Sequence, residues 1–316
     1  MAGKKVVRQI IGWLIAAAII FILFRTVYVN WAELQNWNWQ ISWPLALLSI
    51  LLLAAAYVTA SQGWRTILYG FGHRIRFHES FRVVYLANLG RYIPGKVWQV
   101  IGMVGLAREV NIPAKISLAS FALVQAYALP ASFLLVLIML GYAAPLQALA
   151  VYRDIFYIFM AVVVLIFLIL FFAPKGLNWA LNRILKLFRQ EAVQYRPDFK
   201  NRLAIFAWYL VTWVFLGLSF HFFVAALIAD SGFRVLFSAG AYIAAYNLGY
   251  ISFISPGGLG VREGVMSALL APQLGGPVAA SIALIHRVWI TLAEAVISLL
   301  ALLTYKIKSG GRLPSK

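Results

Sequence analysis

The sequence of 316 residues contains no cysteine and only nine acidic residues. The absence of cysteine excludes disulfides, thiol catalysis, zinc–thiolate sites and iron–sulfur clusters. The chain also lacks a P-loop pattern, so we do not expect it to hydrolyse ATP. Its loop acids are scattered, without the DxD or paired cluster that a metal-dependent transferase would need. We therefore expect no metal, no other cofactor and no enzymatic activity.

Hydrophobic residues dominate the composition, at 63% against 11% charged residues. Soluble domains are rarely more than about half apolar, and several runs here exceed the roughly 20 residues that cross a bilayer as a helix. We predict an all-α polytopic membrane protein with six full transmembrane helices. These spans are predicted at Ile10–Val29, Leu45–Gly63, Ile116–Gly141, Ile155–Phe172, Leu203–Ala229 and Val278–Tyr305.

Two further apolar regions are interrupted by helix-breaking residues. Val83–Ala107 contains the string NLGRYIPGK, and Val235–Leu270 contains NLGYISFISPGGLG. Pro and Gly at membrane depth are tolerated only where the freed backbone is buried in protein or lines a cavity. We predict that each region is a re-entrant helical hairpin that enters the membrane part-way and turns back.

The net charge of +18 predicts the orientation of the chain in the membrane. In a soluble protein this charge would suggest nucleic acid as a partner. In the predicted topology, however, nearly all basic residues lie in loops on one side, and the other side keeps little more than Arg153 and Arg234. Cytoplasmic loops carry such an excess of Lys and Arg. We predict that both termini are cytoplasmic, that the basic loops face anionic lipid headgroups, and that nucleic acid is not a partner.

The two broken regions resemble each other, which predicts an inverted repeat. Each contains Asn-Leu-Gly followed by Pro-Gly, and each is followed by a similar string, ASFALVQ or ASIALIH, in the next span. We predict repeat A at 43–142 and repeat B at 203–305 within one integral membrane domain, 1–316. The remaining segments are the first span with its Trp-rich outer loop (1–42), a connecting span with a basic amphipathic helix (143–202), and a basic cytoplasmic tail (306–316). We expect the apolar face of that amphipathic helix to lie on the inner leaflet.

Broken helices suggest an anion site in the membrane interior. A helix that restarts after a break presents free N–H groups and a positive dipole end, which bind anions. Lys96 follows the first break, and Arg262 lies just after the second. This combination suits a phosphate-bearing lipid headgroup.

Glu294 lies near the middle of the last predicted span, on the same helical face as Arg287. An ionisable residue at this depth is a functional candidate by default. The alternative is an ion pair that only holds helices together, such as Arg287 with Glu263 or Arg262 with Glu294. The candidate substrate-binding residues are Asn88, Pro94, Gly95, Lys96, Asn247, Pro256, Gly257, Gly258, Gly260, Arg262, Glu263, Arg287 and Glu294. For the isolated histidines His221 and His286, we expect hydrogen bonds in the protein core.

The strings NLGRYIPGKVWQVIGMVGLAREV, ISPGGLGVREGVMSALL and ALIHRVWITLAEAV resemble the transmembrane family of the lysylphosphatidylglycerol synthase/flippase proteins, including its uncharacterised stand-alone members. The resemblance spans about residues 10 to 305. It implies a lipid flippase in the plasma (inner) membrane of a bacterium or archaeon. The best-known members translocate an aminoacylated phospholipid, and related domains accompany polyprenyl-phosphate glycosyl transfer. Because no aminoacyl-transferase domain follows Tyr305, we expect this chain not to synthesise lysylphosphatidylglycerol.

We therefore predict a flippase that moves an aminoacyl-phosphatidylglycerol, another phospholipid or a polyprenyl-phosphate carrier between leaflets. Two alternatives remain open. One is a lipid-binding partner of a separate synthase or glycosyltransferase that does not itself transport lipid. The other is an integral-membrane glycosyl or phosphoryl transferase. The sequence is compatible with an oligomer.

Overall fold

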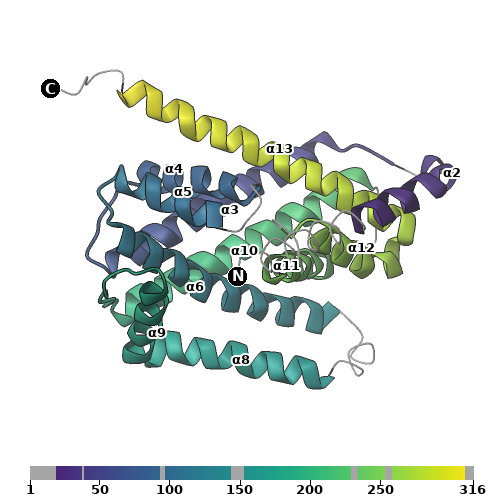
Figure 1. The fold of residues 1–316 in the computed structure, drawn as a ribbon. Coiled ribbons are helices and arrows are strands. Elements are labelled where there is room, and N and C mark those ends of the chain that lie inside the picture. The colour runs from purple at the N-terminus through teal and green to yellow at the C-terminus, as the bar shows by residue number, and fades with distance from the viewer. Residues whose placement is uncertain are drawn as a thin grey trace, which may run out of the picture.

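The computed structural model describes residues 19–37, 39–92, 97–143, 153–228, 234–252 and 258–309. These residues form helices joined by turns and short connections, with one isolated antiparallel bridge between Trp39 and Ile228. The longest helices lie roughly along one axis (Figure 1). The prediction of an all-α membrane protein is therefore confirmed at this level.

Four helices in the described part of the chain are long and apolar enough to cross a membrane. They are α3 (Trp43–Tyr69), α6 (Ala114–Ala143), α10 (Phe199–Leu227) and α13 (Gly276–Ser309). Each coincides with a predicted span, although all four extend beyond the predicted bounds at one or both ends.

Two other predicted spans are only partly tested. Of the first predicted span, Ile10–Val29, the structure describes only the helix Ile19–Val29. This helix precedes the short helix α2 (Trp31–Gln35). The other is α8 (Arg153–Phe172), which meets α9 (Pro174–Leu187) at a bend of 105°. Counting that bent pair as one span raises the number of candidate spans among described residues to five. The total of six stays a prediction.

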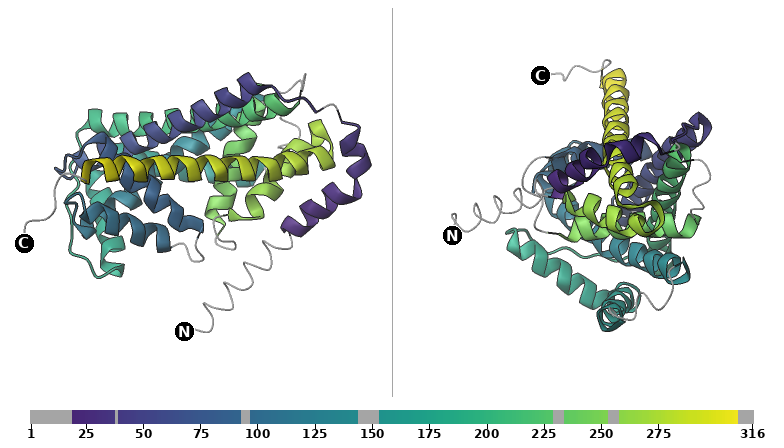
Figure 2. Two further views of the ribbon diagram at one scale, coloured as in Figure 1. Left: turned by 90° about the horizontal axis from the view of Figure 1, so that it is seen from above. Right: turned by 90° about the vertical axis from the view of Figure 1, so that its right-hand side faces the viewer.

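Each broken region forms two short helices. The first consists of α4 (Phe77–Asn88), a 3-10 turn at Leu89–Tyr92, and α5 (Val97–Arg108). The second consists of α11 (Val235–Ile251) and α12 (Val261–Leu274). The two pairs lie toward opposite ends of the long axis (Figures 1 and 2).

Helices α3 and α10 form the centre of the bundle. Ser49 and Ser219 each donate a hydroxyl hydrogen bond to the other's backbone carbonyl, both at 2.8 Å. Further along, the hydroxyls of Thr59 and Thr212 lie 2.8 Å apart. Residue numbers rise along α3 as they fall along α10, so the two helices are antiparallel. Small hydroxylated residues let membrane helices approach closely and satisfy their polar groups across the interface.

The other long helices contact the broken region that is distant from them in sequence. Helix α6 packs against α11, and α13 packs against α4. Each predicted repeat therefore supports the first short helix of the other. An inverted repeat would produce this reciprocal packing, but the repeat itself stays a prediction.

The amphipathic helix is confirmed as α9, but the expected partner of its apolar face is wrong in part. Leu177, Leu181 and Leu185 are buried against the protein rather than lying on the leaflet. Along the next face, the side-chain amides of Asn178 and Asn182 hydrogen bond to the backbone of Tyr195 and Val193. The large apolar side chains of Trp179, Ile184 and Leu187 on this helix, and of Phe188 just after it, remain exposed.

Candidate functional site

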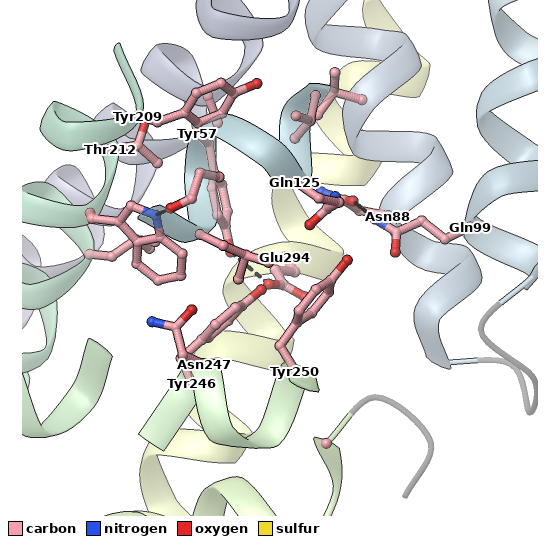
Figure 3. Close-up of a pocket in the computed structure, with 18 of the residues that line it drawn as sticks. Tyr57, Asn88, Gln99, Gln125, Tyr209, Thr212, Tyr246, Asn247, Tyr250 and Glu294 are labelled. Carbon is pink, nitrogen blue, oxygen red and sulfur yellow. Dashed lines mark hydrogen bonds between the residues drawn. The ribbon is translucent and has the colours of Figure 1, made fainter. Parts of the chain in front are cut away.

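A cavity of about 310 Å³ lies where the two broken regions meet the long helices. Its walls include side chains from all four long helices and from α4, α5, α11 and α12. Apolar and aromatic groups make up most of the lining, and a smaller set of polar groups points inward (Figure 3). This mixture is typical of small-molecule sites, which usually have volumes of about 300–1,000 Å³.

The cavity brings together several residues that the sequence singled out. Those that line it are Asn88, Asn247, Gly258, Arg262, Arg287 and Glu294. Glu263 contacts Arg287 from behind the wall, and Gly260 caps the start of α12. Pro94, Gly95, Lys96, Pro256 and Gly257 lie outside the described residues, so their proposed roles stay predictions.

Glu263 fixes the start of α12. It is 3% exposed, and its Oε2 accepts the backbone N–H of Gly260 at 2.7 Å. Its Oε1 lies 3.3 Å from Nη1 of Arg287 on α13. One carboxylate thus caps a helix and pairs with a cation on the neighbouring helix. The helix-locking ion pair between Arg287 and Glu263 is therefore present.

Arg262 lies in the first turn of α12 and is only 5% exposed. Its Nη2 donates to the hydroxyl of Tyr242 at 3.1 Å. Its guanidinium carbon lies 5.0 Å from the ring centroid of Tyr242 and 4.9 Å from that of Tyr246. Cation–π contacts at this distance orient a guanidinium and stabilise it in a desolvated site. The result is a positive charge held at the cavity wall beside a helix N-terminus.

Glu294 reaches the cavity from α13 (Figure 3). It is 7% exposed, and its Oε1 accepts the hydroxyl hydrogen bond of Tyr57 at 2.7 Å. Tyr57 comes from α3, and its ring packs on that of Tyr85 from α4 with centroids 4.7 Å apart. Three helices thus fix the position of this carboxyl group.

The charged groups of the lining all come from predicted repeat B, while uncharged polar groups come from both predicted repeats. Arg262, Arg287 and Glu294 all belong to repeat B. Repeat A supplies amides: Nε2 of Gln99 donates to Oδ1 of Asn88 at 2.5 Å, and Gln125 lies near them in Figure 3. The cavity therefore has a charged wall and an amide wall.

The glycine of each Asn-Leu-Gly motif permits a close backbone contact. A Cβ on Gly90 would lie 2.7 Å from the backbone of Trp98 and Gln99 in the opposite arm of its broken region. A Cβ on Gly249 would lie 2.9 Å from Cβ of Arg262, again in the opposite arm. The repeated glycine therefore has the same steric role in both regions.

Several lining residues were not selected from the sequence. They include Tyr57, Gln99, Gln125, Tyr246 and Tyr250. Gln99 and Gln125 carried a usable signal, because an amide inside an apolar run needs a partner. The tyrosines carried a weaker signal, since this chain has 15 of them.

The two histidines have different surroundings. Nδ1 of His221 lies 2.9 Å from the hydroxyl of Ser238, so the predicted hydrogen bond is confirmed. His286 is buried, and its ring packs nearly edge-on against Phe220, Phe223 and Tyr242. Among the described residues, no three His, Asp or Glu side chains are grouped to hold a metal ion.

Comparison with known proteins supplies the family. No curated protein matches the chain. A family model described as the lysylphosphatidylglycerol synthase TM region matches residues 9–298. This match covers α3, α6, α10 and both broken regions completely, and α13 as far as residue 298. The chain belongs to the lysylphosphatidylglycerol synthase TM-region family of multi-pass membrane proteins.

Proposed function

We propose that this protein is a flippase that moves a phosphate-bearing lipid between the two leaflets. The headgroup crosses through the cavity while the acyl or prenyl tails stay in the hydrocarbon. The main support is the buried guanidinium of Arg262 in the wall of a cavity bounded by both broken regions. The substrate class includes aminoacyl-phosphatidylglycerol, other phospholipids and polyprenyl-phosphate carriers.

The cavity offers a substitute for water along the transport path. A polar or charged headgroup without partners in hydrocarbon would lose several kcal/mol of solvation. Arg262 can supply charge-assisted hydrogen bonds to phosphate oxygens, and the N-terminus of α12 adds a favourable dipole. Arg262 lines the cavity and lies in the first turn of α12, so we assign the phosphate to Arg262. The amide wall would face the rest of the headgroup.

The proposed topology provides access from both sides. It has six spans, two re-entrant hairpins in an inverted repeat, and cytoplasmic termini in the plasma membrane. Inverted repeats with broken helices at a central site are typical of alternating-access transporters. The antiparallel α3–α10 pair and the opposite placement of the two broken regions support this arrangement.

The test is headgroup exchange in liposomes. Purified protein is reconstituted with a trace of fluorescent phosphatidylglycerol, aminoacyl-phosphatidylglycerol or polyprenyl-phosphate, and an impermeant quencher reports the outer leaflet. We expect exchange in wild type, a large loss in Arg262→Ala and partial retention in Arg262→Lys. Arg183→Ala is the control, because Arg183 lies over Trp179 in a similar cation–π contact on α9 but does not line the cavity.

The outcomes separate transport from simple binding. Exchange that depends on Arg262 supports the flippase proposal. If folded wild type binds a lipid but exchanges none of the three, the chain is instead a binding partner for a separate synthase or glycosyltransferase. Equal exchange in wild type and Arg262→Ala would overturn the assignment of Arg262 as the residue that binds the lipid phosphate.

A further inference from the structure

The sides of α9 differ in what they contact. Side chains three or four positions apart lie on one face of a helix, and Leu177, Leu181 and Leu185 form the face that is buried in the protein. On the side next to these leucines, Asn178 and Asn182 hydrogen bond to the backbone of the segment that follows the helix. Two sides of α9 are therefore held by protein, which fixes the direction of the other two.

The other two sides of α9 are exposed, and they differ in character. One is apolar: Ile184 is 39% exposed, Leu187 is 83% exposed, and Phe188 follows directly after the helix at 51%. The other combines an aromatic ring with positive charges, and its exposed residues are Lys175, Trp179, Arg183 and Lys186. The helix contains no acidic residue. Its exposed surface is therefore both apolar and positively charged.

The bend between α8 and α9 places this surface where a candidate span ends. Only Ala173 separates the two helices, and they meet at 105° (Figure 1). A helix that leaves a span at nearly a right angle runs along the membrane surface. Three basic side chains on one exposed side would also be costly within the hydrocarbon. We therefore place α9 at the level of the lipid headgroups.

The composition of the two exposed sides matches an anionic leaflet. Helices that lie in the headgroup region bear Trp, Phe and Leu toward the acyl chains and Lys or Arg on the polar side. The guanidinium carbon of Arg183 lies 5.4 Å from the ring centroid of Trp179, a contact that holds the indole on the basic side. A soluble acidic protein would match the basic side only, and a neutral leaflet would match the apolar side only. An anionic leaflet matches both.

We propose that the exposed surface of α9 binds anionic phospholipids in the leaflet where α8 ends. Ile184, Leu187 and Phe188 lie among the upper parts of the acyl chains, and Lys175 and Lys186 contact the phosphate groups. None of these residues lines the cavity. The lipids bound here surround the protein and are not the molecule that it transports, so the inference holds whether or not the chain is a flippase.

The absence of cysteine allows a direct test with single labels. Leu187→Cys carries a fluorophore, and the protein is reconstituted in phosphatidylcholine with an equal fraction of either brominated phosphatidylglycerol or brominated phosphatidylcholine as quencher. We expect the anionic quencher to associate about fivefold more strongly, the factor that one basic residue contributes near an anionic surface. Lys175→Gln combined with Lys186→Gln should bring this ratio close to one. Leu292→Cys is the control, because Leu292 is 61% exposed on an apolar side of α13, with Val288 and Val296.

A second measurement changes the salt and not the chain. Raising the ionic strength from about 0.1 M to about 1 M shortens the screening length from about 10 Å to about 3 Å. The preference of the label at position 187 for the anionic quencher should fall, because it comes from charge. Quenching by the zwitterionic lipid should stay the same, because it comes from the apolar side of the helix.

Each outcome supports or overturns the proposal. A preference for the anionic lipid at position 187, lost with the two lysines, supports it. Equal quenching by the two lipids would overturn the anionic ligand. A label at 187 that neither lipid quenches, in protein whose label at 292 is quenched, would overturn the membrane location. Aqueous iodide then separates the remaining occupants: quenching by iodide indicates a side open to water, and protection from it indicates a side covered by a second copy of the chain.

Discussion

The close crossing of α11 and α12 can be tested by adding a single methyl group. Gly258 has φ +72°, and a Cβ there would lie 2.8 Å from the carbonyl oxygen of Gly249. Gly72, in the turn after α3, has φ +78°, but a Cβ there would meet nothing within 4 Å. Gly258→Ala and Gly72→Ala therefore share the same backbone strain, and only the first introduces a clash.

The expected losses of stability follow from the backbone strain and from the clash of the added methyl group. An alanine in the left-handed region costs about 1–2 kcal/mol, and an extra methyl in a packed site costs about 1–3 kcal/mol more. Gly72→Ala should therefore lose about 1–2 kcal/mol and Gly258→Ala about 2–5 kcal/mol. At roughly 2–4 °C per kcal/mol, the two melting temperatures should differ by about 2–12 °C.

The assay is thermal unfolding of the purified proteins in detergent, followed by intrinsic tryptophan fluorescence. Lipid exchange is measured on the same preparations. Gly258→Ala should also lose exchange, because its clash displaces Gly249, which lies against Arg262. Equal melting temperatures for the two variants would refute the close backbone contact and, with it, the argument that this glycine positions the guanidinium.

Three further predictions concern stability. Ser49→Ala and Ser219→Ala should each lower the melting temperature, and the double variant should lose less than the sum because the reciprocal contacts are shared; strict additivity would contradict this. Gly105→Ala should raise stability by about 0.5–1 kcal/mol, because Gly105 lies inside α5 and its Cβ would meet nothing within 4 Å; a lower melting temperature would be unexpected. Lys115, by hydrogen bond and charge, lowers the pKa of Glu191, so their contact stabilises the protein above the ordinary carboxyl pKa and is lost as pH falls through the lowered value. Proteolysis of loop 188–198 should therefore increase as the pH falls below the ordinary carboxyl range, and Lys115→Ala should abolish that change.

The sequence predicted the long helices well because their signal is local. Runs of apolar residues mark α3, α6, α10 and α13 without reference to any partner. Their ends were less accurate: α3 continues past Gly63 to Tyr69 because Ile67 is buried in the main core cluster, and Trp64 and Leu68 are buried in a second one. The partner of α9 was also missed, since amphipathicity shows which face is apolar but not whether protein or lipid covers it.

The charged part of the cavity was predictable and its aromatic part was not. Arg262, Arg287 and Glu294 stand out because charge is rare in this chain, and desolvation forces such groups together. Tyr57 and Glu294 are 237 positions apart, and nothing local in either segment indicates that they meet. Gln99 and Asn88 are closer in sequence, yet their contact depends on the fold of the first broken region.

The reciprocal packing of α6 on α11 and of α13 on α4 has a mechanical consequence. Together with the α3–α10 pair, these contacts link the two predicted repeats into one rigid frame. The two repeats cannot move apart without separating buried surfaces. The α5 arm is held less tightly, because only Met103 and Ala107 on it are buried, whereas α12 is joined to α13 by the Glu263–Arg287 pair and by buried side chains. In the proposed transport cycle, movement of this one arm in a fixed frame would expose little apolar surface, so lipid tails would stay outside the frame while the headgroup passes within.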